Sequence, residues 1–128
     1  MASTSLEQIV THLEFLGYQI ERDKDVVKAR HQTKVNILLR DFRGGVLLTS
    51  IFGCQDHAKK NRAAYLDFIN AMNQKATIIR YYADSDSDFF MEAWFPGTYD
   101  RAVFGGFLEL WEEDIARLSQ SDASKFLS

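Results

Sequence analysis

Three aspartates alternate with serine at residues 84–88, directly before the apolar and aromatic run 89–95. Carboxylates at the first, third and fifth positions are typical of a helix–loop–helix calcium loop, which also needs glycine at the sixth position and glutamate at the twelfth. Phe89 and Phe95 occupy those two positions, so such a loop could neither turn nor close around the ion. Because Asp and Ser side chains bond readily to nearby backbone, we expect a hairpin tip here, with a weak cation site as the minor alternative.

Other residues suited to catalysis or metal binding are few. Cys54 and His57 are three apart, a spacing seen at metal sites, but no second pair completes a set of four ligands. A Cys–His nucleophile needs both groups within hydrogen-bond reach and an orienting third group, and nothing in the sequence indicates one; the other histidines, His12 and His31, are expected on a helix and at a strand end. Neither Gly-Gly pair has the spacing of a phosphate-binding loop. The sequence therefore predicts no catalytic residue, no metal and no cofactor.

Composition narrows the class of protein further. The chain has 128 residues, 46% of them hydrophobic and 26% charged, which is typical of one globular domain over residues 1–128. With 15 basic and 18 acidic side chains the net charge is -3, so we expect neither nucleic acid nor an anionic membrane as a partner. A single cysteine fits a reducing compartment, and the first ten residues lack the pattern of a secretory signal. We expect a cytoplasmic protein.

The elements that must position these residues follow from hydrophobic periodicity. A capping box at Thr4 and Glu7 predicts a first helix that ends at Gly17. Four strands follow, with turns near Asp23 and at residues 43–45; a second helix runs from Asp56 to about residue 73. The runs 77–83 and 89–95 predict two more strands, and a last helix begins near residue 98. The tail 119–128 reads as polar and frayed. The order α-β-β-β-β-α-β-β-α predicts an α+β fold, with helices packed on one face of an antiparallel sheet.

The Gly105-Gly106 pair is unusual in that last helix, because each glycine costs about 1 kcal/mol relative to alanine. A kink or close packing against the sheet is the simpler interpretation. A small-residue contact with another subunit is the alternative.

The two hairpin tips predict which side chains share a face. Closing the acidic hairpin with Asp84 opposite Asp88 places Arg80 opposite Glu92, a favourable cross-strand pair. The turn at residues 43–45 pairs Leu39 with Leu48 on the core side. The side away from the helices, which we call the outer face, then holds charges mixed with large apolar residues: Leu38, Arg40, Phe42, Leu47, Ile51, Ile78, Arg80, Tyr82, Phe90, Glu92 and Trp94.

An antiparallel sheet with one solvated face should be polar on that face, and extended apolar patches usually mark an interaction surface. We therefore expect the outer face to bind a protein or peptide partner or a second copy of the chain. The alternative is that a helix or the tail folds over it.

Several strings carry a resemblance to a known family. "LEQIVTHLEFLGYQIERDKDVVKARHQTKVNILLRDFRGGVLLTSIF", "YLDFINAMNQKATIIRYYADSDSDFFMEAWF" and "FLELWEEDIARL" together resemble the YbjN-like family of putative bacterial sensory transduction regulators, from Leu6 to Leu118. The resemblance implies a fold like that of type III secretion chaperones. It also implies a bacterial, cytoplasmic, non-enzymatic binding protein that forms a homodimer, and it supplies no catalytic residues.

The leading hypothesis is thus a chaperone-like or regulatory protein-binding module. The runner-up is a small ligand-binding domain or enzyme with a pocket between helices and sheet. A pocket that joins Cys54 to His57 or His31 would favour that second function.

Overall fold

The computed structural model describes residues 3–128, and its described elements confirm the α+β class. The helices are α1 (Thr4–Phe15), α2 (Asp56–Lys60), α3 (Arg62–Lys75) and α4 (Arg101–Ser119), followed by the short 3-10 helix η1 (Asp122–Lys125). The strands are β1 (Gln19–Asp23), β2 (Val26–Arg30), β3 (Ile37–Phe42), β4 (Gly45–Phe52), β5 (Arg80–Ala83) and β6 (Phe89–Phe95). They form a six-stranded sheet in the order β1-β2-β3-β4-β6-β5.

The chain divides into two compact units. The first unit contains the residues up to Ser50 together with Ala93–Phe107, and the second contains Ile51–Glu92 and Leu108–Ser128. The single domain expected over residues 1–128 stays a prediction, and each unit is described by itself below.

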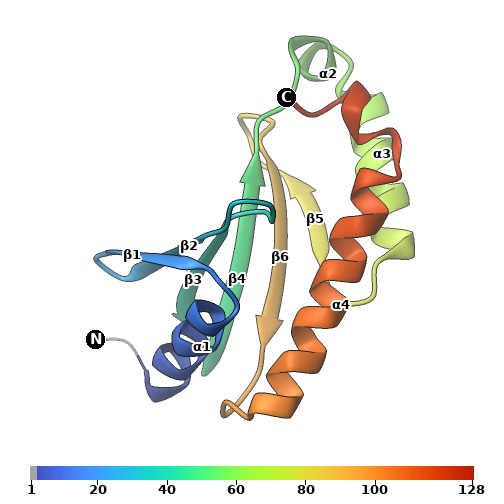
Figure 1. The fold of residues 1–128 in the computed structure, drawn as a ribbon. Helices are drawn as coiled ribbons and strands as arrows, with labels where there is room; N and C mark the ends of the chain where they lie inside the picture. The colour runs from blue at the N-terminus through green and yellow to red at the C-terminus, as the bar shows by residue number, and fades with distance from the viewer. Residues whose placement is uncertain (1–2) are drawn as a thin grey trace. The chain divides into compact units, whose positions relative to one another are not determined.

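In the first unit, α1 lies against β1 and β3 (Figure 1). Register decides which sheet face it covers, because side chains alternate along a strand. Val27 is opposite Leu39, and Leu39 is opposite Leu48, so these three residues share the inner face. They are buried, as are the four inward residues of α1: Leu6, Ile9, Val10 and Leu13.

Polar contacts attach α1 to the edges of this inner face. Glu7 forms a two-bond ion pair with Arg22 of β1, with N–O distances of 2.7 and 2.8 Å, and Ser3 bonds to Asp41 of β3. The Ser3 hydroxyl also accepts from the Leu6 amide at 3.0 Å. The capping box predicted at Thr4 and Glu7 is therefore wrong by one residue: Ser3 caps the helix, and Glu7 is used by Arg22.

In the second unit, α3 packs on β5 (Figure 1). The Phe68 ring of α3 lies 6.1 Å from that of Phe89, which starts β6. The side-chain amide of Asn73 donates to the Tyr81 carbonyl oxygen and accepts from the Tyr81 amide, both at 2.9 Å. Asn73 thus bonds both the backbone N–H and the backbone C=O of Tyr81 in this edge strand.

The acidic segment forms the predicted hairpin tip. The Asp84 amide donates to the Asp88 carbonyl oxygen at 3.1 Å, and one Asp84 carboxylate oxygen accepts from the amides of Asp86 and Asp88. The register then places Arg80 opposite Glu92, as predicted. The turn therefore occupies the first of the three carboxylates, that of Asp84, as the Asp-Ser pattern indicated.

The helix predicted from Asp56 to about residue 73 is two helices. The Asn61 side-chain amide donates to the His57 carbonyl oxygen at 2.9 Å and so ends α2. Arg62, the first residue of α3, donates to the Ser87 hydroxyl at 2.7 Å. The hydrophobic stripe is continuous, but the helix is not. The Asn61 bond ends α2, and the Arg62–Ser87 bond fixes the start of α3.

The tail is folded, so the predicted fraying is wrong. The Phe126 ring stacks on the Phe68 ring of α3, with 5.0 Å between the ring centres. The side-chain amide of Gln55 donates to the Leu127 carbonyl oxygen at 2.9 Å. Leu127 also forms an isolated β-bridge with Cys54. The apolar pair Phe126-Leu127, near the end of a polar segment, binds the tail beside α2 and α3.

Helix α4 begins one residue after Asp100, whose carboxylate accepts from the Val103 amide at 3.0 Å. It continues through Gly105 and Gly106 without interruption. Among the described residues, no heavy atom beyond neighbouring residues and local helix backbone lies within 4 Å of the place that a Cβ would take at either glycine. Close packing against the sheet therefore does not explain the pair.

Candidate functional site

The outer face consists of the side chains that point away from α1 in the first unit and away from α3 in the second. In the first unit the register pairs Arg40 with Leu47 and Phe42 with Gly45, on the side opposite the buried Leu39–Leu48 pair. In the second unit it pairs Tyr82 with Phe90 and Arg80 with Glu92, opposite the buried Tyr81–Met91 pair. The predicted face assignments of these residues are confirmed. Leu38, Phe42, Ile78, Tyr82 and Phe90 are half-buried, and Arg40, Ile51, Arg80 and Trp94 are exposed.

Three predicted outer-face residues lie differently from the expectation. Leu47 is buried because its strand β4 has hydrogen-bonded neighbours on both sides. Glu92 is buried beneath Arg80, whose guanidinium lies 2.6 Å from the carboxylate. Ile78 lies before β5, which begins only at Arg80. The Ile78 amide donates to the Asp114 carboxylate of α4 and not to a neighbouring strand. The predicted strand 77–83 is shorter by three residues for the same reason.

An arginine–aromatic cluster, made by Arg40, Phe42, Arg43 and Trp94, dominates the outer face of the first unit. The guanidinium carbons of Arg40 and Arg43 lie 4.7 and 4.9 Å from the centre of the Phe42 ring, within the range of cation–π attraction. The Trp94 indole N–H donates to the Phe42 carbonyl oxygen at 2.8 Å, yet Trp94 remains 44% exposed. The cluster thus combines a half-buried Phe42 ring and an exposed Trp94 ring with two positive charges close to the Phe42 ring.

The seat of the Trp94 ring explains a glycine in the turn at residues 43–45. A Cβ on Gly45 would stand 2.6 Å from the indole Nε1 and even closer to the Phe95 carbonyl oxygen. Only glycine fits this close approach without movement of the backbone or the ring. Gly44 has a φ of +80°, which the turn requires. Gly44 is therefore explained by backbone conformation and Gly45 by the space that the Trp94 ring occupies.

On the outer face of the second unit, the charged side chains pair with each other. Arg80 donates to one Glu92 oxygen at 3.1 and 2.6 Å and also lies over the Tyr82 ring. The Tyr82 and Phe90 rings stack at 5.0 Å. Burial, with the Glu92 carboxylate second, raises the pKa of the Tyr82 hydroxyl. Because its acid and base neutralise each other, this surface offers less charge to a partner than the arginine–aromatic cluster does.

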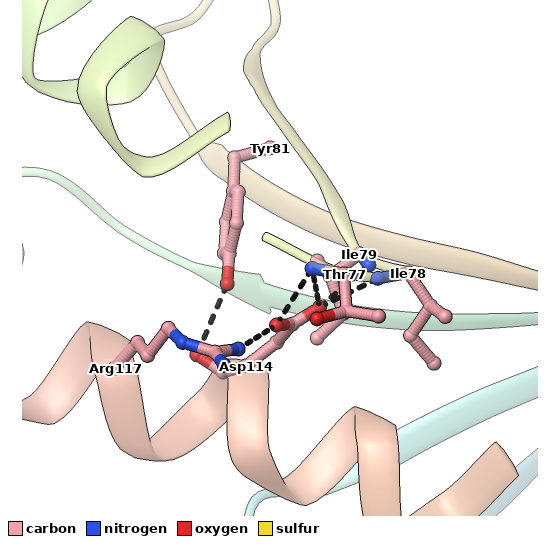
Figure 2. A network of polar contacts seen from close by, with 6 residues as sticks. All are labelled: Thr77, Ile78, Ile79, Tyr81, Asp114 and Arg117. Carbon is pink, nitrogen blue, oxygen red and sulfur yellow. Dashed lines mark hydrogen bonds and ion pairs between the residues drawn. The ribbon is translucent and has the colours of Figure 1, made fainter. Parts of the chain in front are cut away.

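A buried carboxylate that the sequence analysis missed organises the polar interior of the second unit (Figure 2). Asp114 of α4 is 0% exposed and accepts from three successive backbone amides: Thr77 at 3.0 and 3.1 Å, Ile78 at 2.9 Å and Ile79 at 2.9 Å. Arg117, one turn along α4, donates to it at 2.5 Å. These amides could hold an anionic ligand, but the protein's own carboxylate fills the position, so the network is structural.

Two neighbours complete this network. The Tyr81 hydroxyl donates to the Asp114 backbone carbonyl oxygen at 3.1 Å (Figure 2), and burial together with the Asp114 charge raises the pKa of that hydroxyl. Arg117, whose side chain is partly exposed, turns back to Asp114. A signal was present in the sequence, since Asp114 stands three residues after Trp111 and four before Leu118, in the apolar stripe of α4. An acid at such a position needs a buried partner.

The residues named for the runner-up function make other contacts. Cys54 is buried beside Leu127, and a His57 ring nitrogen lies 3.0 Å from the Gln55 side-chain oxygen. The His31 ring packs on Tyr18 in the other unit. Within residues 3–128 no three His, Cys, Asp or Glu side chains form a group that could hold a metal ion. None of the helices in that range combines the length and apolar character needed to cross a bilayer.

Comparison with known proteins gives a family match and a match to a solved structure. The family model named YbjN, described as "Putative bacterial sensory transduction regulator", matches residues 4–120. Among solved structures, "Crystal structure of YbjN, a putative transcription regulator from E. coli" matches with a TM-score of 0.74 at 15% sequence identity, covering 96% of this chain and 95% of that one. No curated protein matches. At this identity the structural match shows the fold alone.

Proposed function

The chain belongs to the YbjN family, and we propose that it is a non-enzymatic regulatory or chaperone-like module that binds a segment of another protein on its outer face. The observation that carries the proposal is the arginine–aromatic cluster of the first unit. Trp, Phe and Arg side chains are enriched where protein interfaces have their largest binding energies. Here the Trp94 ring is held by its hydrogen bond to the Phe42 backbone carbonyl oxygen before any partner arrives, which lowers the entropic cost of binding.

Charge indicates what kind of segment would fit. Arg40 and Arg43 are exposed and lie over the Phe42 ring, and in the described part of the chain neither forms an ion pair with a carboxylate. A partner with acidic side chains beside an apolar or aromatic one would complement both features. On the free edge of β5, Asn73 already bonds the backbone of Tyr81. The partner is therefore proposed to bind mainly through side chains on the face, and not by adding a strand to that edge.

The test compares two charge-matched double variants. Arg40→Glu with Arg43→Glu reverses the cluster, and Lys59→Glu with Lys60→Glu makes the same charge change on the exposed residues of α2. Each tagged protein captures partners from an extract of the source bacterium, and the partners are identified by mass spectrometry and rebound as purified proteins. We expect the cluster variant alone to lose the partner. Equal binding by both variants would contradict the proposal.

Nucleic acid is the competing occupant, because arginine beside aromatic rings also suits single strands, and the E. coli structure carries the description of a transcription regulator. The net charge of -3 opposes it. Salt-dependent retention of the wild type on a polyanion column, abolished in the cluster variant, would favour nucleic acid over protein.

A cytoplasmic homodimer with a fold like the type III secretion chaperones remains part of the proposal, as the family resemblance implies. Light scattering during gel filtration measures the mass directly. A mass equal to the 14.7 kDa monomer at all concentrations would contradict the dimer while leaving partner binding on the cluster open to its own test.

A further inference from the structure

A second concave surface, separate from the outer face, lies in the first unit between α1 and the start of α4. Its volume is about 520 Å³, within the roughly 300–1,000 Å³ that small-molecule pockets occupy. Residues of α1, the following Leu16 and the segment at Tyr99 and Arg101 line it. Because α1 covers the inner face, this groove shares no residue with the arginine–aromatic cluster.

One wall of the groove is unusually apolar for a solvated position. Phe15 is 80% exposed and Leu16 is 42% exposed, although both are large apolar side chains. Single exposed apolar residues are ordinary, but two neighbouring ones in the wall of one concavity mark a binding surface. An apolar body placed here would remove these side chains from water.

The groove also holds a cation without an acidic partner. Among residues 3–128, Arg101 forms no ion pair; its guanidinium carbon lies 5.8 Å from the centre of the Phe15 ring. Glu7, the acid that lines the same groove, is bound by Arg22 at 2.7 and 2.8 Å. Asp100, beside Arg101 in the chain, caps α4 through the Val103 amide. Glu7 and Asp100 are thus engaged elsewhere, and the positive charge of Arg101 at the apolar wall is available to a ligand.

His12 and Tyr99, which also line the groove, form a hydrogen-bonded pair. His12 Nδ1 lies 2.8 Å from the Tyr99 hydroxyl, and the imidazole packs edge-on against Tyr99 and Phe104. Burial lowers the pKa of His12, and the Arg101 charge lowers it further, so the ring is neutral at pH 7. When the Tyr99 hydroxyl donates to Nδ1, the proton of the imidazole is on Nε2, which is then a hydrogen-bond donor.

We infer that this groove binds a small molecule with an apolar body and a single carboxylate group. The apolar body lies against Phe15 and Leu16, and the carboxylate pairs with the Arg101 guanidinium, which suits a planar two-oxygen acceptor. The size of the groove, its exposed apolar wall and its unpaired cation are three observations that one such ligand satisfies together. The inference stands independently of the proposed protein partner on the outer face.

The test uses pairs of probes that differ in charge alone. Octanoate and 2-naphthoate carry the carboxylate, and 1-octanol and 2-naphthylmethanol are their neutral counterparts. Each is titrated into the full isotope-labelled chain while amide shifts are followed by NMR. We expect saturable shifts at the end of α1 and near Arg101, with each carboxylate binding at least about tenfold more tightly than its alcohol, as a charge-assisted bond would give.

Two variants and one matched control locate the site. Arg101→Gln removes the cation at an exposed helix start and should weaken the carboxylates about tenfold while leaving the alcohols unchanged. Phe15→Ala should weaken all four probes. Arg30→Gln makes the same substitution as the first variant on an exposed arginine of β2 and should change nothing. Because Phe15 and Arg101 are exposed, these variants are expected to fold.

Several results would overturn the inference. One is equal binding of carboxylates and alcohols with no effect of Arg101→Gln, and another is a set of shifts that maps to the arginine–aromatic cluster. Absence of saturable binding for all four probes at millimolar concentration would also overturn it, and so would binding of only an acidic amphipathic peptide in the groove. The Arg40→Glu, Arg43→Glu double variant should keep its affinity for the carboxylates, which separates this inference from the proposed protein partner.

Discussion

Replacing Asp114 by alanine should be among the most destabilising changes in the second unit. The substitution removes the carboxylate that accepts from the amides of Thr77, Ile78 and Ile79 and pairs with Arg117. A buried donor that loses its partner costs about 1–3 kcal/mol, and loss of one member of a buried ion pair costs about 3–5 kcal/mol. Because the Arg117 side chain is 39% exposed and can turn to water, we expect about 3 kcal/mol.

The measurement combines a global and a local readout. Urea unfolding followed by circular dichroism gives the loss of unfolding free energy, against a total of about 5–15 kcal/mol for an ordinary domain. Hydrogen exchange reports the amides of Thr77, Ile78 and Ile79 individually and should show them losing protection in Asp114→Ala. Asp114→Asn, which keeps one oxygen but turns an NH₂ group toward amide donors, should also destabilise.

Glu113→Ala is the matched control, because the neighbouring acid is exposed. It should change the unfolding free energy by no more than about 0.5 kcal/mol. If Asp114→Ala also lost less than about 1 kcal/mol and the three amides kept their protection, the carboxylate would not be what holds the α3–β5 connection to α4.

Three further predictions test other parts of the fold. Gly45→Ala should cost at least about 1–3 kcal/mol, because its methyl group would collide with the Trp94 ring and the Phe95 carbonyl oxygen; urea unfolding and the Trp94 indole N–H resonance measure it. Phe126→Ala should cost about 1–3 kcal/mol, below the roughly 3–5 kcal/mol of a fully buried phenylalanine, since the ring is half-buried on Phe68; limited proteolysis should then cut the tail faster. Burial chiefly, then Arg101, depresses the pKa of His12 in the fold. Its contribution to stability is present above the unfolded value near 6.5 and is lost as the pH falls through the folded pKa, as urea unfolding at a series of pH values would measure.

Each of these predictions has its own control. Gly44→Ala tests the turn rather than the ring, because nothing lies within 4 Å of a Cβ there and only the positive φ is strained; equal effects of both glycine changes on the Trp94 resonance would contradict the close-approach argument. Ser128→Ala leaves the Phe126 ring in place and should not expose the tail to the protease. His12→Gln should flatten the pH dependence, and an unchanged slope would assign that dependence to other groups.

Local patterns predicted a large part of the strand pairing. The Asp-Ser tip placed Asp84 opposite Asp88 and hence Arg80 opposite Glu92, and the glycine turn paired Leu39 with Leu48. These predictions succeed because neighbouring strands joined by a short turn have few registers, and alternation then assigns every side chain to a face. The arginine–aromatic cluster was partly predicted for this reason, since Arg40, Phe42 and Trp94 were already placed on one side.

Contacts between residues distant in the sequence escaped prediction. Asn61 ends a helix within an unbroken hydrophobic stripe, and Phe126 is a lone aromatic in a polar tail. Whether Asn61 ends a helix and whether Phe126 packs or stays in solvent depend on residues that only folding brings near. For Phe126 that residue is Phe68. The groove beside α1 was missed because Phe15 and Arg101 come from opposite ends of the chain.

The order of residues alone determined the α+β class, the hairpin registers and the two faces of the sheet, because these depend on period and on turns a few residues long. Tertiary structure decided which polar groups are buried. The amides at residues 77–79 acquire a carboxylate from α4 more than thirty residues away, and within the described range 3–128 Arg101 lies over the Phe15 ring without a carboxylate partner. Electrostatic pairing depends on distance in space, and only the folded chain sets that distance.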